Sequence, residues 1–369
     1  MKHLVYLLIL LLLGCRSTLK VVSSVKDNSV MQTELSPAQI QAITDALSEF
    51  PNESEMSVAL VTQNSTLFYG LKKQHDTIKA VDYSRSVFEI GSITKVFTTH
   101  LLLNAVADGV ISHLDAPIQA YSPFPIKGDP PITFKQLANH TSGLPGSISM
   151  SVFSANRANP YQSWHEDKLK KYLEKEVELE STPGDQYTYS NVGMAVLANT
   201  LGHLRSSTYE AQLQEEIFEP LQMTHSTSQR RAIRNKLVPG YNWKGKATDN
   251  WDLAAFEGAG AVLSTTEDLS HYLNWSMEAL ESQLSEMSHA SIQVDEHLAV
   301  ALGWHVIKGY TSEPFLWHNG GTGGYKSSMG INLANHTGVV ILTNIGATGN
   351  PKKGMIDQLC YALMQTMDD

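Results

Sequence analysis

The sequence predicts an α/β fold, in which an antiparallel β-sheet flanked by helices is built from both ends of the chain around a large helix-rich insert. Strand patterns lie near residues 56–70 and again after residue 298, helical patterns fill most of the stretch between them, and short turns join neighbouring strands. We therefore expect residues 36–109 and 281–369 to form the α/β domain, and residues 110–280 to form a helix-rich domain.

The elements follow one another in a definite order. Ser36-Pro37 begins an amphipathic helix that runs to Phe50. Asn64-Ser65 is the expected hairpin turn between the first two strands. The expected strands are 56–61, 66–70, 300–307, 315–318, 325–333 and 339–343, with a hairpin turn at 335–338. The expected helices after the first are 92–108, 133–139, 166–179, 192–204, 208–221, 267–280 and 353–367. Ser264-Thr-Thr-Glu267 is a capping box for the helix that starts at 267.

Composition limits the class of protein. With 369 residues, 42% of them hydrophobic, the chain is long enough to bury a large core. Its formal charge is −10 and it lacks basic clusters, so nucleic acid is not an expected partner. Of its two cysteines, Cys360 lies at helical spacing from Ile356, Leu359 and Leu363, which predicts a packed thiol. The core must therefore hold the fold without an internal disulfide.

The N-terminus predicts export from the cytoplasm. Residues 1–14 combine a basic start with an apolar run too short to span a bilayer, which is typical of a signal peptide. Leu12-Leu13-Gly14-Cys15 resembles a bacterial lipobox, and this resemblance implies that Cys15 carries lipid. Residues 15–35 would then be a lipid-attached tether on a protein anchored to the periplasmic face of a bacterial membrane. A simple signal peptide cleaved elsewhere is the alternative.

Ser92-Ile-Thr-Lys95 places a hydroxyl and an amine one helical turn apart. It follows a strand-forming run and Gly91, so the hydroxyl is presented at the start of a helix. If burial keeps Lys95 neutral, the amine can take the Ser92 proton and activate a nucleophile. The spacing alone is weak, because Ser17-Thr-Leu-Lys20 and Ser23-Ser-Val-Lys26 repeat it. An N-cap serine beside an ordinary surface lysine is the alternative interpretation.

Two further motifs lie where chain elements end. Tyr189-Ser-Asn191 follows a turn and precedes an apolar helix, so its side chains can enter a cleft. His318-Asn-Gly-Gly321 opens a glycine-rich run after an apolar strand, where backbone can approach a ligand closely. The sequence has no His-Glu-x-x-His motif, no paired cysteines, no Walker loop and no Gly-x-Ser-x-Gly elbow. We therefore expect neither a metal nor a cofactor.

These motifs, in this order and spacing, resemble those of class C serine β-lactamases and the related penicillin-binding D-alanyl-D-alanine peptidases. The resemblance covers nearly the whole mature chain and includes four further segments, namely residues 133–145, 183–184, 218–223 and 258–265. It implies a β-lactamase/transpeptidase-like fold. It also implies a small-molecule or peptidoglycan-derived substrate.

The resemblance assigns a role to each matching residue. Ser92 would be the acylating nucleophile, and Lys95 its proton acceptor or the group that lowers its pKa. Tyr189 would relay a proton to the leaving nitrogen, which requires a cation nearby because a free phenol titrates near pH 10. Asn191 would bind the side-chain amide of the substrate. The backbone N–H groups of Ser92 and Gly321 would form the oxyanion hole.

The chain departs from this pattern where most of these β-lactamases carry Lys-Thr-Gly. His318, Asn319 and Gly320 stand there, and the resemblance makes them substrate-binding residues. An unperturbed histidine, with a pKa near 6.5, is mostly neutral at pH 7, so it should attract a substrate carboxylate less strongly than lysine does. Asn319 also lacks the threonine hydroxyl. We therefore expect less efficient β-lactam hydrolysis than in those enzymes.

The leading functional hypothesis is a serine hydrolase that cleaves a β-lactam or a D-amino-acid peptide amide through an acyl-enzyme on Ser92. A short-chain carboxylesterase of the same fold is the second hypothesis. The third is a non-hydrolytic penicillin- or peptidoglycan-sensing protein, whose acyl adduct persists. The sequence does not identify the group that activates the deacylating water, and it leaves the oligomeric state open.

Overall fold

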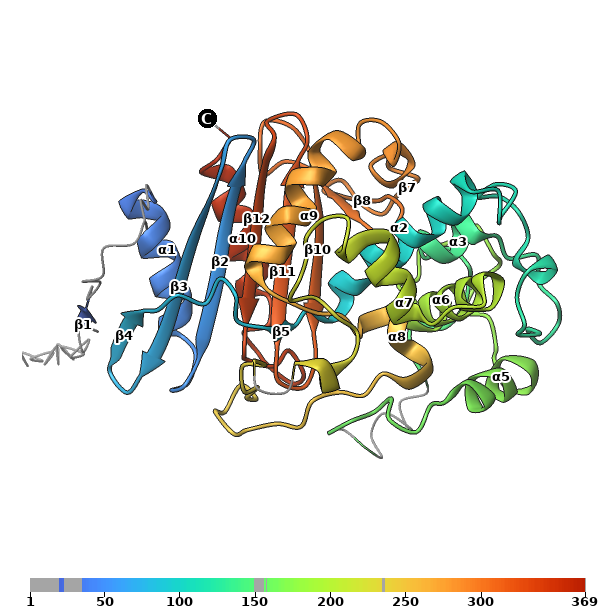
Figure 1. The fold of residues 1–369 in the computed structure, drawn as a ribbon, viewed down its shortest axis with the longest axis horizontal. Coiled ribbons are helices and arrows are strands. Elements are labelled where there is room, and N and C mark those ends of the chain that lie inside the picture. The colour runs from blue at the N-terminus through green and yellow to red at the C-terminus, as the bar shows by residue number, and fades with distance from the viewer. Residues whose placement is uncertain (1–19, 23–34, 149–155, 157, 234–235, 369) are drawn as a thin grey trace, which may run out of the picture.

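The computed structural model describes residues 20–22, 35–148, 156, 158–233 and 236–368. Among them, ten strands form one sheet in the order β1-β4-β3-β2-β12-β11-β10-β9-β8-β7 (Figure 1). Neighbouring strands are antiparallel except for β1 and β4, which are parallel. The strands are β1 Lys20–Val22, β2 Glu55–Thr62, β3 Ser65–Gln74, β4 Thr77–Ala80, β7 Ile292–Gln293, β8 Leu298–Val300, β9 His305–Ile307, β10 Phe315–Gly321, β11 Lys326–Asn332 and β12 Thr337–Thr343.

The centre of the sheet joins the two ends of the chain. β12 pairs with β2 along the whole length of β12, with Val58 opposite Ile341. β12 in turn pairs with β11, and β11 with β10, so β2 from the N-terminal part of the chain and these C-terminal strands form one surface. This confirms the predicted fold class, an antiparallel sheet flanked by helices and built from both chain ends.

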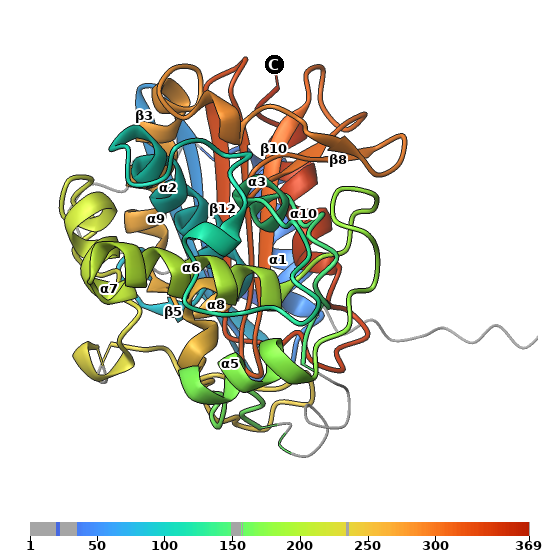
Figure 2. The ribbon, with the colours of Figure 1, turned by 90° about the vertical axis from the view of Figure 1, so that its right-hand side faces the viewer.

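Two hydrophobic cores cover the two faces of the sheet, because successive residues of a strand point to opposite faces. Val58 and Leu60 of β2 pack into the core that contains α1 and α10, whereas Ala59 and Val61 pack into the core that contains α9. Figure 2 shows α9 and α10 on opposite sides of the sheet. The covering helices are α1 Pro37–Ser48, α9 Thr266–Ala279 and α10 Met355–Gln365. Cys360 is buried in the α10 core, as predicted.

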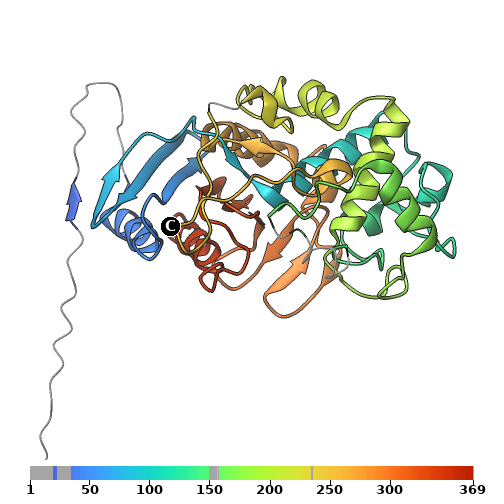
Figure 3. The ribbon, with the colours of Figure 1, turned by 90° about the horizontal axis from the view of Figure 1, so that it is seen from below.

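The helix-rich part lies beside the end of the sheet that carries β10 to β7 (Figure 3). Its α2 packs against α6 and α8, and β5 pairs with β6 in a separate two-stranded sheet. Its α-helices and strands are β5 Phe88–Glu89, α2 Thr94–Ala107, α3 Phe134–Ala138, α5 Glu166–Lys175, α6 Asn191–Arg205, α7 Tyr209–Leu213, α8 Glu257–Gly260 and β6 Leu263–Ser264. Single turns complete it: η1 Gly91–Ile93, η2 Ile118–Ala120, η3 Gln214–Phe218, η4 Arg230–Ala232, η5 Ala254–Phe256 and η6 Ser285–Met287. α9, which the sequence places in the helix-rich segment 110–280, packs on the sheet instead.

Local capping explains where two of the helices begin. Ser36 and Gln39 form a capping box at the start of α1, with Pro37 in the first turn, where the sequence predicts that the helix begins. The cap of α9 is displaced by one residue from the prediction. Thr265 is the N-cap and accepts a hydrogen bond from the Asp268 N–H at 3.0 Å, so the predicted box of Ser264 with Glu267 is wrong.

Two predicted elements are divided in the structure. The expected strand 300–307 is a tight hairpin of β8 and β9, closed by a hydrogen bond from Ala301 N to Trp304 O at 2.9 Å. Gly303 takes a φ of +73° there, which makes the reversal possible. The expected helix 208–221 is α7 followed by a π-helical turn. The spacing of apolar residues alone predicts neither break, because the residues on both sides of each break still face the core.

The predicted signal peptide and Cys15 lie outside the described residues, so the lipid anchor and the membrane location stay predictions. Within the predicted tether, Lys20–Val22 forms β1, which adds to the β4 edge of the sheet. Among the described residues, no helix is both long and apolar enough to cross a membrane.

Candidate active site

Ser92 lies on the single 3-10 turn η1, between β5 and α2. Ile93 rather than Ser92 occupies the N-cap position of α2, and neither helix has a side-chain cap. The structure therefore excludes the interpretation of Ser92 as an N-cap serine. Gly91 has a φ of +52°, which glycine adopts without strain, so the chain turns sharply after β5 and presents the half-buried Ser92 hydroxyl.

Lys95 is the second residue of α2, and its side chain is completely buried. Its Nζ lies 3.0 Å from Ser92 Oγ and donates a hydrogen bond to the Ala259 carbonyl oxygen at 2.6 Å. Burial lowers the pKa of Lys95 well below its ordinary 10.5, because a low-dielectric environment disfavours the charged amine. Lys95 is therefore not an ordinary surface lysine, and the amine and the hydroxyl are in contact as their spacing predicts.

Tyr189 approaches this pair from the loop before α6. The N-cap of α6 is Ser190, whose Oγ accepts a hydrogen bond from Gly193 N at 2.8 Å and so fixes the end of the loop. Lys95 Nζ lies 4.8 Å from the centre of the Tyr189 ring, and the phenol hydrogen-bonds with Ser92. Burial raises the pKa of Tyr189 above 10, although the Ser92 contact lowers it. The phenol is therefore protonated at neutral pH and can donate a proton.

Close packing of glycines places the end of β10 beside the Ser92 turn. A Cβ on Gly320 would lie 1.9 Å from the Ile90 carbonyl oxygen, and a Cβ on Gly91 would lie 2.6 Å from Gly321 N. Only glycines allow the two backbones to approach this closely. The arrangement brings the backbone N–H of Gly321 next to the turn that carries Ser92, where two N–H groups can bind a developing oxyanion.

A small cavity of about 40 Å3 opens at these groups. Asn191 lies on its wall and donates a hydrogen bond from Nδ2 to the Tyr161 hydroxyl at 3.3 Å. A larger chamber of about 650 Å3 shares Trp251, Leu253 and Gly260 with the cavity. The residues that line the cavity, all of them uncharged, are Gly91, Ser92, Tyr161, Asn191, Trp251, Leu253, Ala259, Gly260, Gly321 and Thr322.

The side chains of His318 and Asn319 do not line this cavity, and their role in substrate binding stays a prediction. They occupy successive positions of β10 and therefore point to opposite faces of the sheet. Asn319 Nδ2 donates to Asp357 Oδ2 of α10 at 2.9 Å. His318 is 1% exposed, and its Nδ1 lies 2.7 Å from the Asn319 carbonyl oxygen, which can only accept, so Nδ1 carries a proton. Gly320 packs on Ile90 and likewise does not line the cavity.

Two histidines that the sequence reasoning missed, His140 and His305, surround Tyr189 together with His318. Their ring centres lie 4.5, 6.3 and 6.2 Å, respectively, from that of Tyr189. Burial lowers the pKa of His140 and of His318 well below 6.5 and lowers that of His305 to about 4. The layer is therefore uncharged at neutral pH, and His318 offers no cation. His140 lies within residues 133–145, a segment that carries the family resemblance, whereas His305 lies in no motif.

The buried histidines make stability depend on pH. His305 has a folded pKa of about 4 and an unfolded pKa near 6.5, so the unfolded chain binds more protons below pH 6.5 and stability falls as the pH falls toward 4. This residue should contribute a loss of about 2 kcal/mol between pH 7 and pH 5. Urea unfolding should therefore show that His305→Gln loses about 2 kcal/mol less than the parent over this interval. The exposed His203→Gln should match the parent, and an equal loss in all three proteins would contradict the assignment.

The sequence profile of the family described as Beta-lactamase matches residues 43–358. The chain belongs to the β-lactamase family. Among curated proteins with similar sequences, Protein flp of Staphylococcus aureus strain MW2 is 24% identical to this chain over 314 residues. The chain is 29% identical over 279 residues to Beta-lactamase-like protein 4 of Dictyostelium discoideum. The alignments cover 79% and 66% of this chain but only 60% and 47% of those relatives, so the chain spans about half to three fifths of their length.

Several solved structures share the fold of this chain. The penicillin-binding protein homologue of Pyrococcus abyssi has a TM-score of 0.74 at 20% identity, covering 89% of this chain and 77% of its own. A β-lactamase/D-alanine carboxypeptidase of Pseudomonas syringae has a TM-score of 0.74 at 19% identity, covering 89% and 97%. A class C β-lactamase has a TM-score of 0.73 at 18% identity, covering 90% and 95%. At these identities the likeness establishes the fold and not the activity.

Proposed function

We propose that this β-lactamase family member is a serine acyl-hydrolase that acts through an acyl-enzyme on Ser92. Lys95 takes the proton of the Ser92 hydroxyl as Oγ attacks the carbonyl carbon, and the Ser92 and Gly321 N–H groups bind the resulting oxyanion. Tyr189 then gives its phenolic proton to the leaving group, and the Lys95 ammonium returns a proton to the phenolate. The net result is transfer of the serine proton to the leaving group.

One observation carries this proposal: a fully buried amine lies 3.0 Å from a half-buried hydroxyl. A charged lysine would hold the serine proton in place by donation alone. Because burial lowers the pKa of Lys95, a neutral amine with a free lone pair is accessible near neutral pH. The Tyr189 ring packed against that amine adds a proton donor within reach of the same oxygen.

The cavity favours a short, uncharged acyl ester as the substrate. Its volume of about 40 Å3 leaves little room beside Ser92, and its lining residues are uncharged. A carboxylate there would find no compensating cation, because His318 is both buried and neutral. An ester also needs less protonation of its leaving group than an amide does, so the raised pKa of Tyr189 limits ester cleavage less.

A β-lactam or a D-amino-acid peptide amide is the second candidate substrate. Asn191 lies on the cavity wall, and the family resemblance makes it the residue that would bind the amide of such a substrate. The adjoining chamber of about 650 Å3 gives a longer side chain room beyond Trp251 and Leu253. Arg230 lies on the wall of that chamber, where it pairs with Asp252 Oδ1 at 2.7 Å.

Intact-protein mass spectrometry over time, with three acyl donors, tests the proposal. We expect p-nitrophenyl acetate to form an adduct of one acetyl group that is lost on continued incubation, with faster turnover than nitrocefin or a D-Ala-D-Ala peptide. Faster turnover of nitrocefin or of the peptide would overturn the ester preference. An adduct that forms and persists would replace the hydrolase by an acyl-binding sensor. No adduct with any of the three would refute Ser92 as a nucleophile.

A further inference from the structure

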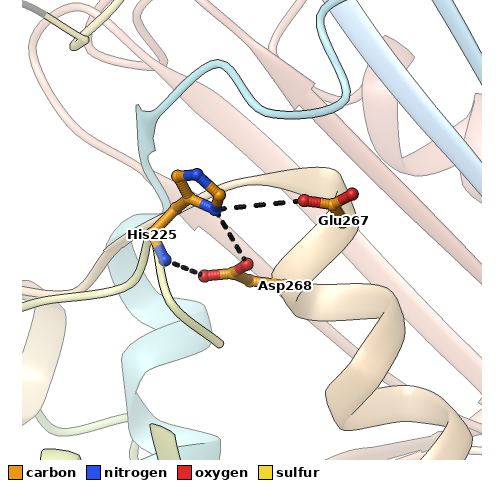
Figure 4. A group of neighbouring side chains, drawn as sticks. All are labelled: His225, Glu267 and Asp268. Atoms are coloured by element: carbon orange, nitrogen blue, oxygen red, sulfur yellow. Dashed lines mark hydrogen bonds and ion pairs between the residues drawn. The ribbon is translucent and has the colours of Figure 1, made fainter. Parts of the chain in front are cut away.

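His225, Glu267 and Asp268 converge on one point at the start of α9. Figure 4 shows the His225 ring, from the loop after η3, facing two carboxylates that follow the α9 cap. His225 Nδ1 lies 3.5 Å from Asp268 Oδ1 and 3.9 Å from Glu267 Oε2. The three ligand atoms are all within 4.8 Å of one another. Nothing in the proposed hydrolysis uses these residues, and none of them lines the catalytic cavity.

Asp268 has an unused oxygen that faces this point. Its Oδ2 accepts hydrogen bonds from His225 N at 2.8 Å and from Ser226 Oγ at 2.7 Å, which holds the carboxylate rigidly. Its Oδ1 is buried and has no hydrogen-bond partner, although the side chain is only 1% exposed. A buried carboxylate oxygen without a donor is costly, and a cation is one group that would satisfy it.

The spacing of the three atoms suits a small divalent cation. Zinc bonds of about 2.0–2.2 Å to nitrogen and oxygen place tetrahedral ligand atoms roughly 3.3–3.6 Å apart. The two shorter separations here, 3.5 and 3.9 Å, come within a few tenths of an ångström of that spacing. One imidazole with two carboxylates is a donor set that zinc accepts, and water can complete the tetrahedron.

We propose that His225, Glu267 and Asp268 form a peripheral binding site for Zn2+, with structural rather than catalytic consequences. The cation would join the loop that carries His225 to the first turn of α9. That loop continues to Thr227, whose backbone exchanges hydrogen bonds with Leu263 of β6 at 3.0 and 2.8 Å. β6 pairs with β5, the strand that leads to the Ser92 turn. A cation bound here would therefore also stabilise the strands that position Ser92.

Arg85 is the competitor for this site. Its Nε lies 3.0 Å from each oxygen of the Glu267 carboxylate, but the Arg85 side chain is 72% exposed. An exposed ion pair of this kind contributes little free energy, so Zn2+ can displace it. This competition predicts that removing the Arg85 side chain strengthens zinc binding rather than weakening it.

The test is calorimetric titration of Zn2+ alone into the untagged protein, after EDTA treatment and removal of the chelator. We expect one site in the parent, at least about tenfold weaker binding in His225→Ala and in Glu267→Gln, and tighter binding in Arg85→Ala. His271→Ala, which removes another histidine of α9, is the matched control and should bind like the parent. Zn2+ should also raise the melting temperature of the parent but not that of His225→Ala.

Three results would overturn the site. The parent could release no heat and show no shift in melting temperature, the His225→Ala and His271→Ala variants could bind equally, or Arg85→Ala could leave binding unchanged or weaker. Each of these results would mean that the three residues form salt bridges only and do not bind zinc. Glu267→Gln is used instead of Asp268→Asn, because Asp268 Oδ2 accepts hydrogen bonds from His225 N and Ser226 Oγ. Asp268→Asn would therefore disturb the loop as well as the proposed metal ligand. Since neither readout is an activity, this result is independent of the proposed hydrolysis.

Discussion

Ser92→Ala is expected to abolish the acyl adduct and to lower the turnover of p-nitrophenyl acetate by at least about four powers of ten, because removing a serine nucleophile leaves only the binding and oxyanion contributions. The fold should survive, since Ser92 is half-buried and caps no helix. Mass spectrometry of the acetylated protein and steady-state kinetics measure the two effects. The parent and the variant should melt at similar temperatures.

The chain supplies a matched control for this substitution. Ser163 also has a lysine at hydrogen-bond distance, with Lys168 Nζ 3.1 Å from its hydroxyl, but this pair is exposed. Ser163→Ala should therefore keep the full adduct and full turnover. An acyl group that still attaches to Ser92→Ala, or that is lost in Ser163→Ala, would show that the nucleophile is elsewhere.

Lys95→Met is expected to lower kcat by about two to four powers of ten with little change in KM, because it removes the proton acceptor and leaves the cavity wall in place. Methionine has a similar length and is uncharged, so it fits the buried space. The Ala259 carbonyl loses the donor that lies 2.6 Å away, which should cost about 1–3 kcal/mol of stability. The pH profile of kcat/KM should lose the limb that reports the lowered pKa of Lys95.

Lys326→Met separates this effect from the general cost of altering a buried lysine. Lys326 is also buried, but its Nζ pairs with Asp357 Oδ2 at 2.9 Å. Its replacement leaves the Asp357 carboxylate without a cation, with the Asn319 amide as a remaining donor, and should destabilise the protein by about 1–3 kcal/mol while the Ser92 adduct still forms. If Lys95→Met retained parental kcat and an unchanged pH profile, Lys95 would not be the proton acceptor.

Local contacts could be predicted from the sequence because they depend on short spacings. Ser92 and Lys95 are three residues apart, and one turn of helix brings them together whatever surrounds them. Ser36 and Gln39 form their capping box for the same reason. The alternation along β2 likewise distributes Val58 and Ala59 to different cores.

The orientation of β10 could not be predicted in this way. Its sequence does not say which residues face α10, so His318 and Asn319 both looked like substrate ligands. The tertiary structure turns Asn319 toward Asp357 and buries His318 behind Tyr189 and His305. A glycine-rich motif at a strand end indicates where backbone approaches a ligand, but not which side chain of the strand reaches it.

The amino-acid sequence by itself determined the antiparallel fold from both chain ends, the family resemblance, and the contact between Ser92 and Lys95. The tertiary structure decided the electrostatics of the site. His140 and His305 come from segments 165 residues apart, and only folding places both rings against Tyr189. The same burial makes Lys95 a weak base and leaves the cavity without a cation. The physical reason is that burial depends on everything packed around a group, whereas local geometry depends on a few neighbouring residues.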